Sequence, residues 1–170
     1  TEKKEILPGT LEVTFETNEP FGFVPGQWVQ LELIDPPYTD ARGNRRIFSL
    51  VNSPRLARII QVVTRLRDSA FKRSLRELPK GAAVNVPRIG GNLVLPADNE
   101  RPIVMIAGGI GIAPFMSMLR YVRDEKLGYD ITLLYSNRSI ASAAYFDELR
   151  KMLGDRMIPT MDGDPSWPGE

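Results

Sequence analysis

The sequence predicts a β plus α/β chain, in which an antiparallel Greek-key barrel precedes part of a parallel, Rossmann-like sheet. Up to residue 97, short segments that alternate apolar and polar side chains are separated by turn residues, as in a small antiparallel barrel. From residue 98 the order becomes strand, helix, strand, helix, strand, which indicates a parallel sheet with right-handed crossovers. We therefore predict two domains, residues 1–97 and 98–170, joined by the polar link 97–101.

The first half is expected to consist mainly of strands. Residues 10–17 and 28–33 alternate apolar and polar side chains, so each is predicted to be a half-buried strand. One helix interrupts the strands after Asp68 or Ser69, either of which can cap it, and Pro79 stops it. Further strands are predicted at 46–51, 58–64 and 82–86.

The second half is arranged around the stretch 102–119. Ile103 to Ala107 form an apolar run without alternation, which predicts a strand covered on both faces. A glycine-rich turn follows, and Pro114 suits the first turn of a helix over about 114–126. The remaining predicted elements are a strand at 130–135, a helix at about 140–153 and a short strand at 156–161.

The glycine-rich turn is a candidate anion site. Gly108, Gly109 and Gly111 let the backbone come close to a ligand where a Cβ would block it. The helix that follows offers unpaired N–H groups and the positive end of its dipole, which together suit a diphosphate. A plain strand-turn-helix joint has the same pattern, and Pro114 differs from the common dinucleotide fingerprint, which has Gly or Ala at its third position.

Composition excludes several classes of function. The chain has 170 residues, 42% of them hydrophobic, and a net charge of +1, so nothing points to nucleic acid or an anionic membrane. It contains neither cysteine nor histidine. This excludes disulfides, an iron–sulfur cluster on its own thiolates, the usual zinc sites and a histidine base, and we predict no metal site. With no membrane span or signal segment in this sequence, the cytoplasm is the expected location.

A second candidate site lies in the strand that begins near Arg45. Arg46 and Phe48 point to one face of that strand and Ser49 points to the other. An arginine beside an aromatic ring suits a ligand that carries both a phosphate and a flat ring system. A strand with one core aromatic and solvated arginines is the alternative, and spacing alone favours it.

Two motifs resemble those of the ferredoxin–NADP reductase family. Gly108–Pro114 is similar to its nicotinamide-nucleotide turn, and Arg46-x-Phe48-Ser49, followed by Ser53 and Pro54, is similar to its flavin motif. In that family the arginine holds flavin phosphate, the aromatic residue packs on the isoalloxazine and the hydroxyl lies near flavin N5. The resemblance implies these roles for Arg46, Phe48 and Ser49, with Ser49 as the catalytic residue.

The resemblance extends to the start of the predicted helix at Asp68–Lys72. In the family, backbone N–H groups at this point bind the flavin pyrophosphate, and the preceding strand lines the ribityl or phosphate part. Many relatives have a small hydroxyl residue where Lys72 stands, which leaves the direct role of this lysine open. The further cofactor-binding residues that the resemblance implies are Ser53, Val62, Thr64, Ser69, Ala70, Phe71 and Lys72.

The end of the second parallel strand is the remaining landmark. Polar residues beyond the carboxyl ends of such strands face the nucleotide. Arg138 could pair with an adenosine 2′-phosphate, and Asn137 and Ser139 with ribose, although a surface arginine without a ligand is equally consistent. NADPH and NADH therefore both stay open, with Gly108, Gly109, Gly111 and Pro114 at the pyrophosphate.

The function implied is that of a flavin-dependent oxidoreductase, which takes hydride from NADPH or NADH onto FAD and passes electrons to a separate acceptor. FMN is less expected than FAD, and the acceptor could be a protein or a small molecule. A non-catalytic flavin-binding electron-transfer or regulatory subunit, and a nucleotide sensor without redox work, are the alternatives. Because the family normally continues with at least two more strands after the polar loop 162–170, we expect a longer reductase or a partner chain that supplies them.

Overall fold

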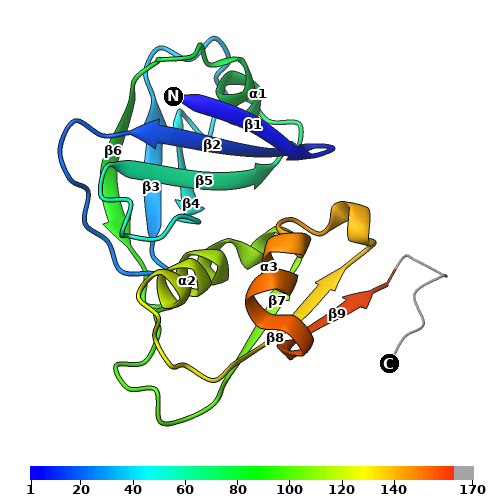
Figure 1. Cartoon of the computed structure of the whole chain (residues 1–170). Coiled ribbons are helices and arrows are strands. Elements are labelled where there is room, and N and C mark those ends of the chain that lie inside the picture. Colours follow the sequence, from blue (N-terminus) through cyan, green and yellow to red (C-terminus); the bar gives the residue numbers. More distant parts are fainter. Residues whose placement is uncertain (163–170) are drawn as a thin grey trace.

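A computed structural model of the chain describes residues 1–162, and the end of the polar loop predicted at 162–170 lies outside the described residues. The described part contains three three-stranded sheets, with strand orders β1-β2-β5, β4-β3-β6 and β7-β8-β9 (Figure 1). The strands are β1 (Glu2–Leu7), β2 (Thr10–Glu16), β3 (Trp28–Leu33), β4 (Arg45–Ser49), β5 (Ile59–Arg65), β6 (Val84–Gly90), β7 (Ile103–Gly108), β8 (Ile131–Asn137) and β9 (Met157–Met161). The α-helices are α1 (Ala70–Glu77), α2 (Ala113–Asp124) and α3 (Phe146–Leu153).

The two antiparallel sheets of the first half enclose a single core. Apolar side chains from β2, β3 and β5 alternate inward, and α1 adds Phe71 and Leu75. After β4 the chain passes from one sheet to the other, because Leu50 bridges Val62 while the Val51 N–H donates to the Gln61 carbonyl. The arrangement is barrel-like, as predicted, although the described ladders do not close into a complete barrel.

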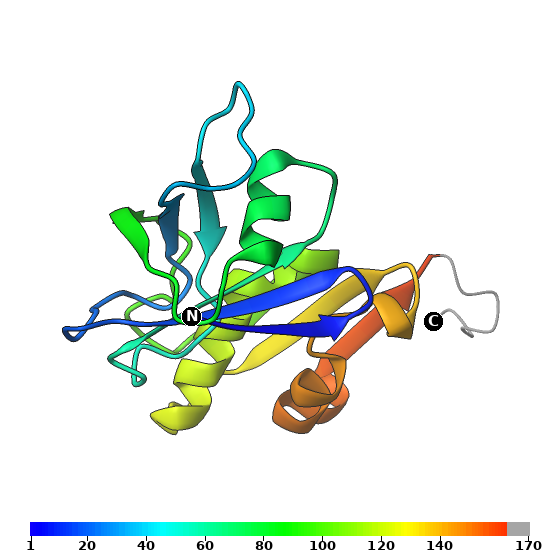
Figure 2. The same cartoon turned by 90° about the horizontal axis from the view of Figure 1, so that it is seen from above.

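The parallel sheet of the second half packs against both of its helices. The described strands pair in the order in which they occur in the chain, and in the view of Figure 2 this sheet, drawn in yellow to red, lies partly behind the blue strands β1 and β2. Met105 of β7 and Leu133 and Tyr135 of β8 share a core with α2 and α3. The predicted strand-helix-strand-helix-strand order is confirmed. The predicted domain boundary at 97/98 falls in the connection 91–102, which contains neither helix nor strand.

The opposite face of the parallel sheet is exposed among the described residues. Val104 and Ile106 of β7 are 59% and 71% exposed, and Ile158 of β9 is 41% exposed. The prediction that 103–107 is covered on both faces is therefore wrong for this part of the chain. Both crossovers are expected to be right-handed and step across the sheet in the same direction, so they place their helices on the same face.

One predicted helix is also corrected, and one strand was not predicted. The helix predicted at 140–153 is a short 3₁₀ turn, Ile140–Ser142, followed by α3, because Tyr145 adopts a left-handed backbone with φ of 60°. The Tyr145 hydroxyl donates to a Glu12 carboxylate oxygen at 2.7 Å, so a tertiary contact lies at the position where the predicted helix is interrupted. Strand β1 was not predicted, because its charged residues lie at a sheet edge, where no apolar alternation is needed.

No helix within residues 1–162 combines the length and the apolar character that crossing a membrane requires.

The one-sided packing of the parallel sheet predicts opposite results for two neighbouring residues of β7. Met105→Ala should lower the free energy of unfolding by about 2–5 kcal/mol, because Met105 is 3% exposed and its loss leaves a cavity. Ile106→Ala should cost less than about 1 kcal/mol, because its side chain is mostly in solvent. Urea unfolding of both variants measures the two values, and an equal loss at Ile106 would mean that the folded protein covers this face.

Candidate functional site

The glycine turn joins β7 to α2 and leaves open space above its backbone. Gly109 has a φ of 51°, and a short 3₁₀ turn, Gly109–Ile112, leads into α2, which has Pro114 in its first turn. A Cβ added to Gly108, Gly109 or Gly111 would meet no other residue within 4 Å. An anionic ligand can therefore approach the backbone closely beside a helix N-terminus. The structure thus brings the four residues predicted for the pyrophosphate into one joint.

Tyr135 of β8, which the sequence analysis did not identify, contacts the backbone of this turn. Its hydroxyl lies 3.1 Å from the carbonyl oxygens of Gly109 and Ala144, and its proton can be donated to either. Burial raises the pKa of Tyr135 to about 12, so the hydroxyl keeps its proton at neutral pH. The turn is therefore tied to the core by a side chain that its own local sequence does not contain.

Asn137 ends β8 with an amide that has no partner within the described residues. It is 6% exposed, and neither Oδ1 nor Nδ2 has a partner within hydrogen-bond distance, although the amide is near enough to the Tyr135 hydroxyl to oppose part of the rise in the pKa of Tyr135. Leaving such a buried polar group unpaired costs about 1–3 kcal/mol, so a bound ligand that supplies a partner would be favoured here. Strand pairing places Ser136, the residue before it, opposite Gly108 at the carboxyl edge of the sheet.

Of the other two residues predicted at this edge, Arg138 is exposed and Ser139 belongs to a local turn. The Ser139 N–H donates to Ser142 Oγ at 3.1 Å, and that hydroxyl donates back to the Ser139 carbonyl at 2.8 Å. Arg138 is thus accessible to a ligand, whereas the backbone of Ser139 is already engaged.

In the first half, the structure brings the motif on β4 next to the start of α1. The Phe48 and Phe71 ring centroids are 5.7 Å apart, and the Arg46 guanidinium carbon lies 5.3 Å from the Phe71 centroid. Arg46 donates to the carbonyls of Arg42 and Gly43, at 2.9 Å each. This places a cation and two aromatic rings together, which is the combination that a phosphate-bearing ring system requires.

The other side chains predicted on these strands have less freedom to meet a ligand. Phe48 is 8% exposed, so only a small part of its ring reaches the surface, and Ser49 is half-buried opposite Trp28. Val62 and Thr64 are buried as whole residues, at 0% and 5% exposure, so little of either reaches the surface. Ser53 is also buried, and its hydroxyl accepts from the Arg55 N–H at 3.3 Å.

The start of α1 forms a basic recess. Ser69 caps the helix, because its hydroxyl accepts from the Lys72 N–H at 3.3 Å, which confirms one of the two predicted caps. Lys72 Nζ donates to the Arg65 carbonyl at 2.6 Å, and burial, reinforced by the charge of Arg67, lowers the pKa of Lys72. A cavity of about 330 Å³ beside Ala70 and Phe71 is lined by Leu66, Arg67, Asp68, Ser69, Lys72, Arg73, Arg76 and Glu77.

The two halves of the chain, each of which carries one candidate site, meet in a continuous contact that we call the seam. Val51 and Val63 of the first half lie in the same apolar core as Ile112 and Met116 beside the glycine turn. Polar contacts continue the seam: Ser117 Oγ donates to the Asn52 carbonyl at 2.7 Å.

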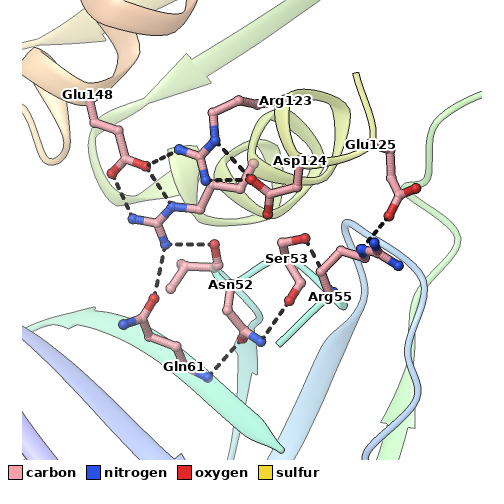
Figure 3. Close-up of polar contacts among 10 residues, drawn as sticks. Asn52, Ser53, Arg55, Gln61, Arg123, Asp124, Glu125 and Glu148 are labelled. Atoms are coloured by element: carbon pink, nitrogen blue, oxygen red, sulfur yellow. Dashed lines mark hydrogen bonds and ion pairs between the residues drawn. The ribbon is translucent and has the colours of Figure 1, made fainter. Parts of the chain in front are cut away.

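In the same seam, Arg120 Nη1 donates to the Val51 carbonyl and to Gln61 Oε1, at 2.9 Å each. Figure 3 shows Asn52 and Gln61 on one side of this contact and Glu148 on the other. The sequence analysis did not identify Ser117 and Arg120. The available signal was that these two polar residues, three positions apart, share one face of an otherwise apolar helix stripe.

The sequence matches one family model and several known proteins, and the fold matches solved structures. Residues 105–161 match the family model of the oxidoreductase NAD-binding domain. The beta subunit of a heme-dependent oxidative N-demethylase from Ectopseudomonas mendocina is 31% identical over 94% of this chain and 50% of its own length. Ferredoxin–NADP reductase B from Sorangium cellulosum is 28% identical over 98% of this chain and 70% of its own length.

Among solved structures, phthalate dioxygenase reductase has the same fold, with a TM-score of 0.80 and 24% identity over 99% of this chain and 52% of that protein. The chain spans half or less of the length of the first four curated relatives, with shares of 50%, 39%, 33% and 33%.

The anchoring of the glycine turn by Tyr135 predicts a specific pH dependence. The folded state raises the pKa of Tyr135 from 10.0 to about 12, so its stabilising contribution is complete below pH 10 and is lost as pH rises to 12. Between these values the wild-type free energy of unfolding should fall by about 2–3 kcal/mol more than that of Tyr135→Phe. Denaturant unfolding across this range measures the difference, and parallel curves for the two proteins would contradict the assigned burial.

Proposed function

We propose that this chain, a member of the ferredoxin–NADP reductase family, binds a flavin and a nicotinamide nucleotide and transfers hydride from the nucleotide to the flavin. Electrons then pass to a separate acceptor. One observation carries the proposal: an open glycine turn and an arginine–aromatic cluster lie on two halves joined by one continuous core through Val63 and Ile112. Such a seam holds two ligands at a fixed separation.

We place the flavin on the first half. Arg46 would hold its phosphate, the N–H groups at the start of α1 would receive the pyrophosphate, and Lys72 adds positive charge to that recess. Ser49 would lie near the reacting nitrogen as the catalytic residue, and FAD is favoured over FMN by the family. When bound, the flavin supplies the chemistry, since it accepts hydride and releases electrons singly, and no side-chain acid or base is needed.

We place the nicotinamide nucleotide at the carboxyl edge of the parallel sheet. The backbone of Gly108 to Pro114 would hold its diphosphate, because the open space there and the helix N-terminus both suit an anion. Asn137 would gain partners for its unpaired amide, and Arg138 and Ser139 lie next to it in the chain. Exposed Arg138 suits either NADPH or NADH, so the proposal covers both.

We propose that the acceptor is another redox centre, protein-bound or small, and that the protein works in the cytoplasm. Phthalate dioxygenase reductase, which has the same fold, transfers electrons from pyridine nucleotides to a [2Fe–2S] centre. This chain contains no cysteine, so its own thiolates hold no such cluster.

The decisive experiment is an anaerobic titration of the flavin-loaded protein with NADH and with NADPH, followed by absorbance in the flavin bands. Bleaching by one nucleotide or both supports the proposed reaction and gives the preference. A yellow protein that neither nucleotide bleaches would instead act as a flavin-binding electron-transfer subunit. A colourless protein that takes up no added FAD or FMN would overturn the flavin site.

Arg46→Ala should weaken flavin affinity by about 10-fold to 100-fold, because one to two charge-assisted hydrogen bonds of about 1.5–3 kcal/mol are lost. Fluorescence titration with FAD measures the change. Arg45→Ala is the matched control: this neighbouring arginine is bound to Glu32 at 2.8 Å, as Arg46 is to Asp40 at 3.3 Å, and its loss should leave affinity unchanged. Equal effects at both positions would remove Arg46 from the flavin site.

Gly111→Val should weaken nicotinamide-nucleotide binding by roughly 10-fold or more while leaving flavin content intact. The substitution is compatible with the fold, because the new Cβ meets no other residue within 4 Å and Gly111 does not have a positive φ. The valine side chain would occupy the space through which the diphosphate reaches the backbone. Calorimetric titration with both nucleotides tests this, and unaltered affinity at wild-type stability would contradict the assigned site.

A further inference from the structure

We propose that Arg120 of α2 is a positioning residue, which fixes the flavin-binding half against the nucleotide-binding half. This inference rests on the proposed function for its consequence, although its structural part can be tested alone. Arg120 touches neither candidate cofactor site. It would act by setting the angle between the two halves, and therefore the separation of the two rings.

The first argument is the number of elements that a single guanidinium joins. Nη1 donates to the Val51 carbonyl, just after β4, and to Gln61 on β5. Nε and Nη2 donate to the two carboxylate oxygens of Glu148 on α3, at 2.8 and 2.7 Å. The guanidinium is planar and rigid, so satisfying these bonds together fixes the relative orientation of the three segments.

The second argument is burial. The Arg120 side chain is 14% exposed, and its guanidinium carbon lies 5.0 Å from the centroid of the Tyr145 ring. The Tyr145 hydroxyl donates to Glu12 on β2, so this ring also bridges the two halves. Hydrogen bonding from Arg120 lowers the pKa of Glu148, which keeps that carboxylate charged at neutral pH. Shielded from water, these bonds hold geometry better than an exposed ion pair would.

The third argument is the position of α2 between the two candidate sites. Its first turn follows the glycine turn, and Arg120 lies further along the same helix. On the other side of the contact, Val51 is two residues beyond Ser49. A rotation of α2 against the first half would therefore change the distance between Ser49 and the glycine turn. A misplacement of about 1 Å can slow a reaction between bound partners by roughly 100-fold.

Arg123 provides a matched control on the same helix. It also donates to Glu148, at 3.4 Å, and its second partner is Asp124 at 2.8 Å, so both of these partners belong to the second half. Replacing Arg123 removes the same charge and weakens a bond to the same carboxylate. It does so without touching the contacts between the halves.

The structural test uses paired spin labels, which the absence of native cysteine makes straightforward. Cysteines at exposed Ala83 in the first half and exposed Lys151 on α3 would carry the labels, and pulsed dipolar spectroscopy gives the distribution of distances. Arg120→Gln should broaden or shift this distribution, while Arg123→Gln should match the wild type. An Arg120→Gln protein that is folded by circular dichroism and keeps the wild-type distribution would overturn the proposal.

The kinetic test compares the rate of flavin reduction by saturating NADH or NADPH with flavin content. Arg120→Gln should slow reduction by about 10-fold to 100-fold at unchanged flavin content, Arg120→Lys should restore only part of the rate, and Arg123→Gln should be unaffected. Full recovery of the reduction rate in Arg120→Lys, or equal losses in Arg120→Gln and Arg123→Gln, would contradict a role for the planar guanidinium of Arg120.

Two further outcomes have their own consequences: an Arg120→Gln variant that does not fold, and a wild-type protein that neither nucleotide reduces. If Arg120→Gln does not fold, Gln61→Leu takes its place, since it removes the side-chain partner of Arg120 in the first half and should broaden the distances to a smaller extent. An unchanged distribution in Gln61→Leu would then count against the proposal. If wild type itself is not reduced by either nucleotide, the proposed function fails, while the label distances still decide whether Arg120 fixes the two halves.

Discussion

The seam between the two halves is the constraint on which the rest of the structure depends. Val51 and Val63 contribute apolar surface to a core that otherwise belongs to the parallel sheet and its helices. Full burial of one such side chain is worth about 1.5–3 kcal/mol, so the seam resists separation before any polar contact is counted. The bonds of Ser117 and Arg120 to backbone carbonyls of the first half then add direction, which apolar packing alone does not supply.

The candidate sites rely on backbone and on few side chains. Several hydroxyls and cations predicted to touch a cofactor are already engaged locally: Ser53 with a backbone N–H, Ser69 as a helix cap and Lys72 with a carbonyl. Glycines without side-chain neighbours and a helix start remain as the groups that can meet phosphate, whereas Arg46 also has local partners, in Asp40 and in backbone carbonyls. This division suits tight binding of diphosphates, because backbone N–H groups held by a folded core need little reorganisation.

Two features of the second half are incomplete within the described residues. The sheet exposes Val104 and Ile106 on one face, and Asn137 buries an amide without a partner on the other. They have different physical meanings. An exposed apolar face is suited to further polypeptide, because burying it releases water. A buried unpaired amide next to an open glycine turn is suited to a polar ligand, because only a hydrogen-bonding group offsets its desolvation.

The sequence by itself determined the local elements: the alternating strands β2 and β3, a helix cap at Asp68 or Ser69, the glycine turn and the order of elements in the second half. These depend on the period of side chains along a strand or helix and on turn chemistry, which act over a few residues. Only the tertiary structure decided that one face of β7 is exposed, that Tyr145 interrupts a predicted helix and that Tyr135 supports Gly109. It also joined Arg120 to Val51, 69 residues away in the chain. Such contacts depend on the topology that brings distant segments together, and no local pattern in the sequence encodes that distance.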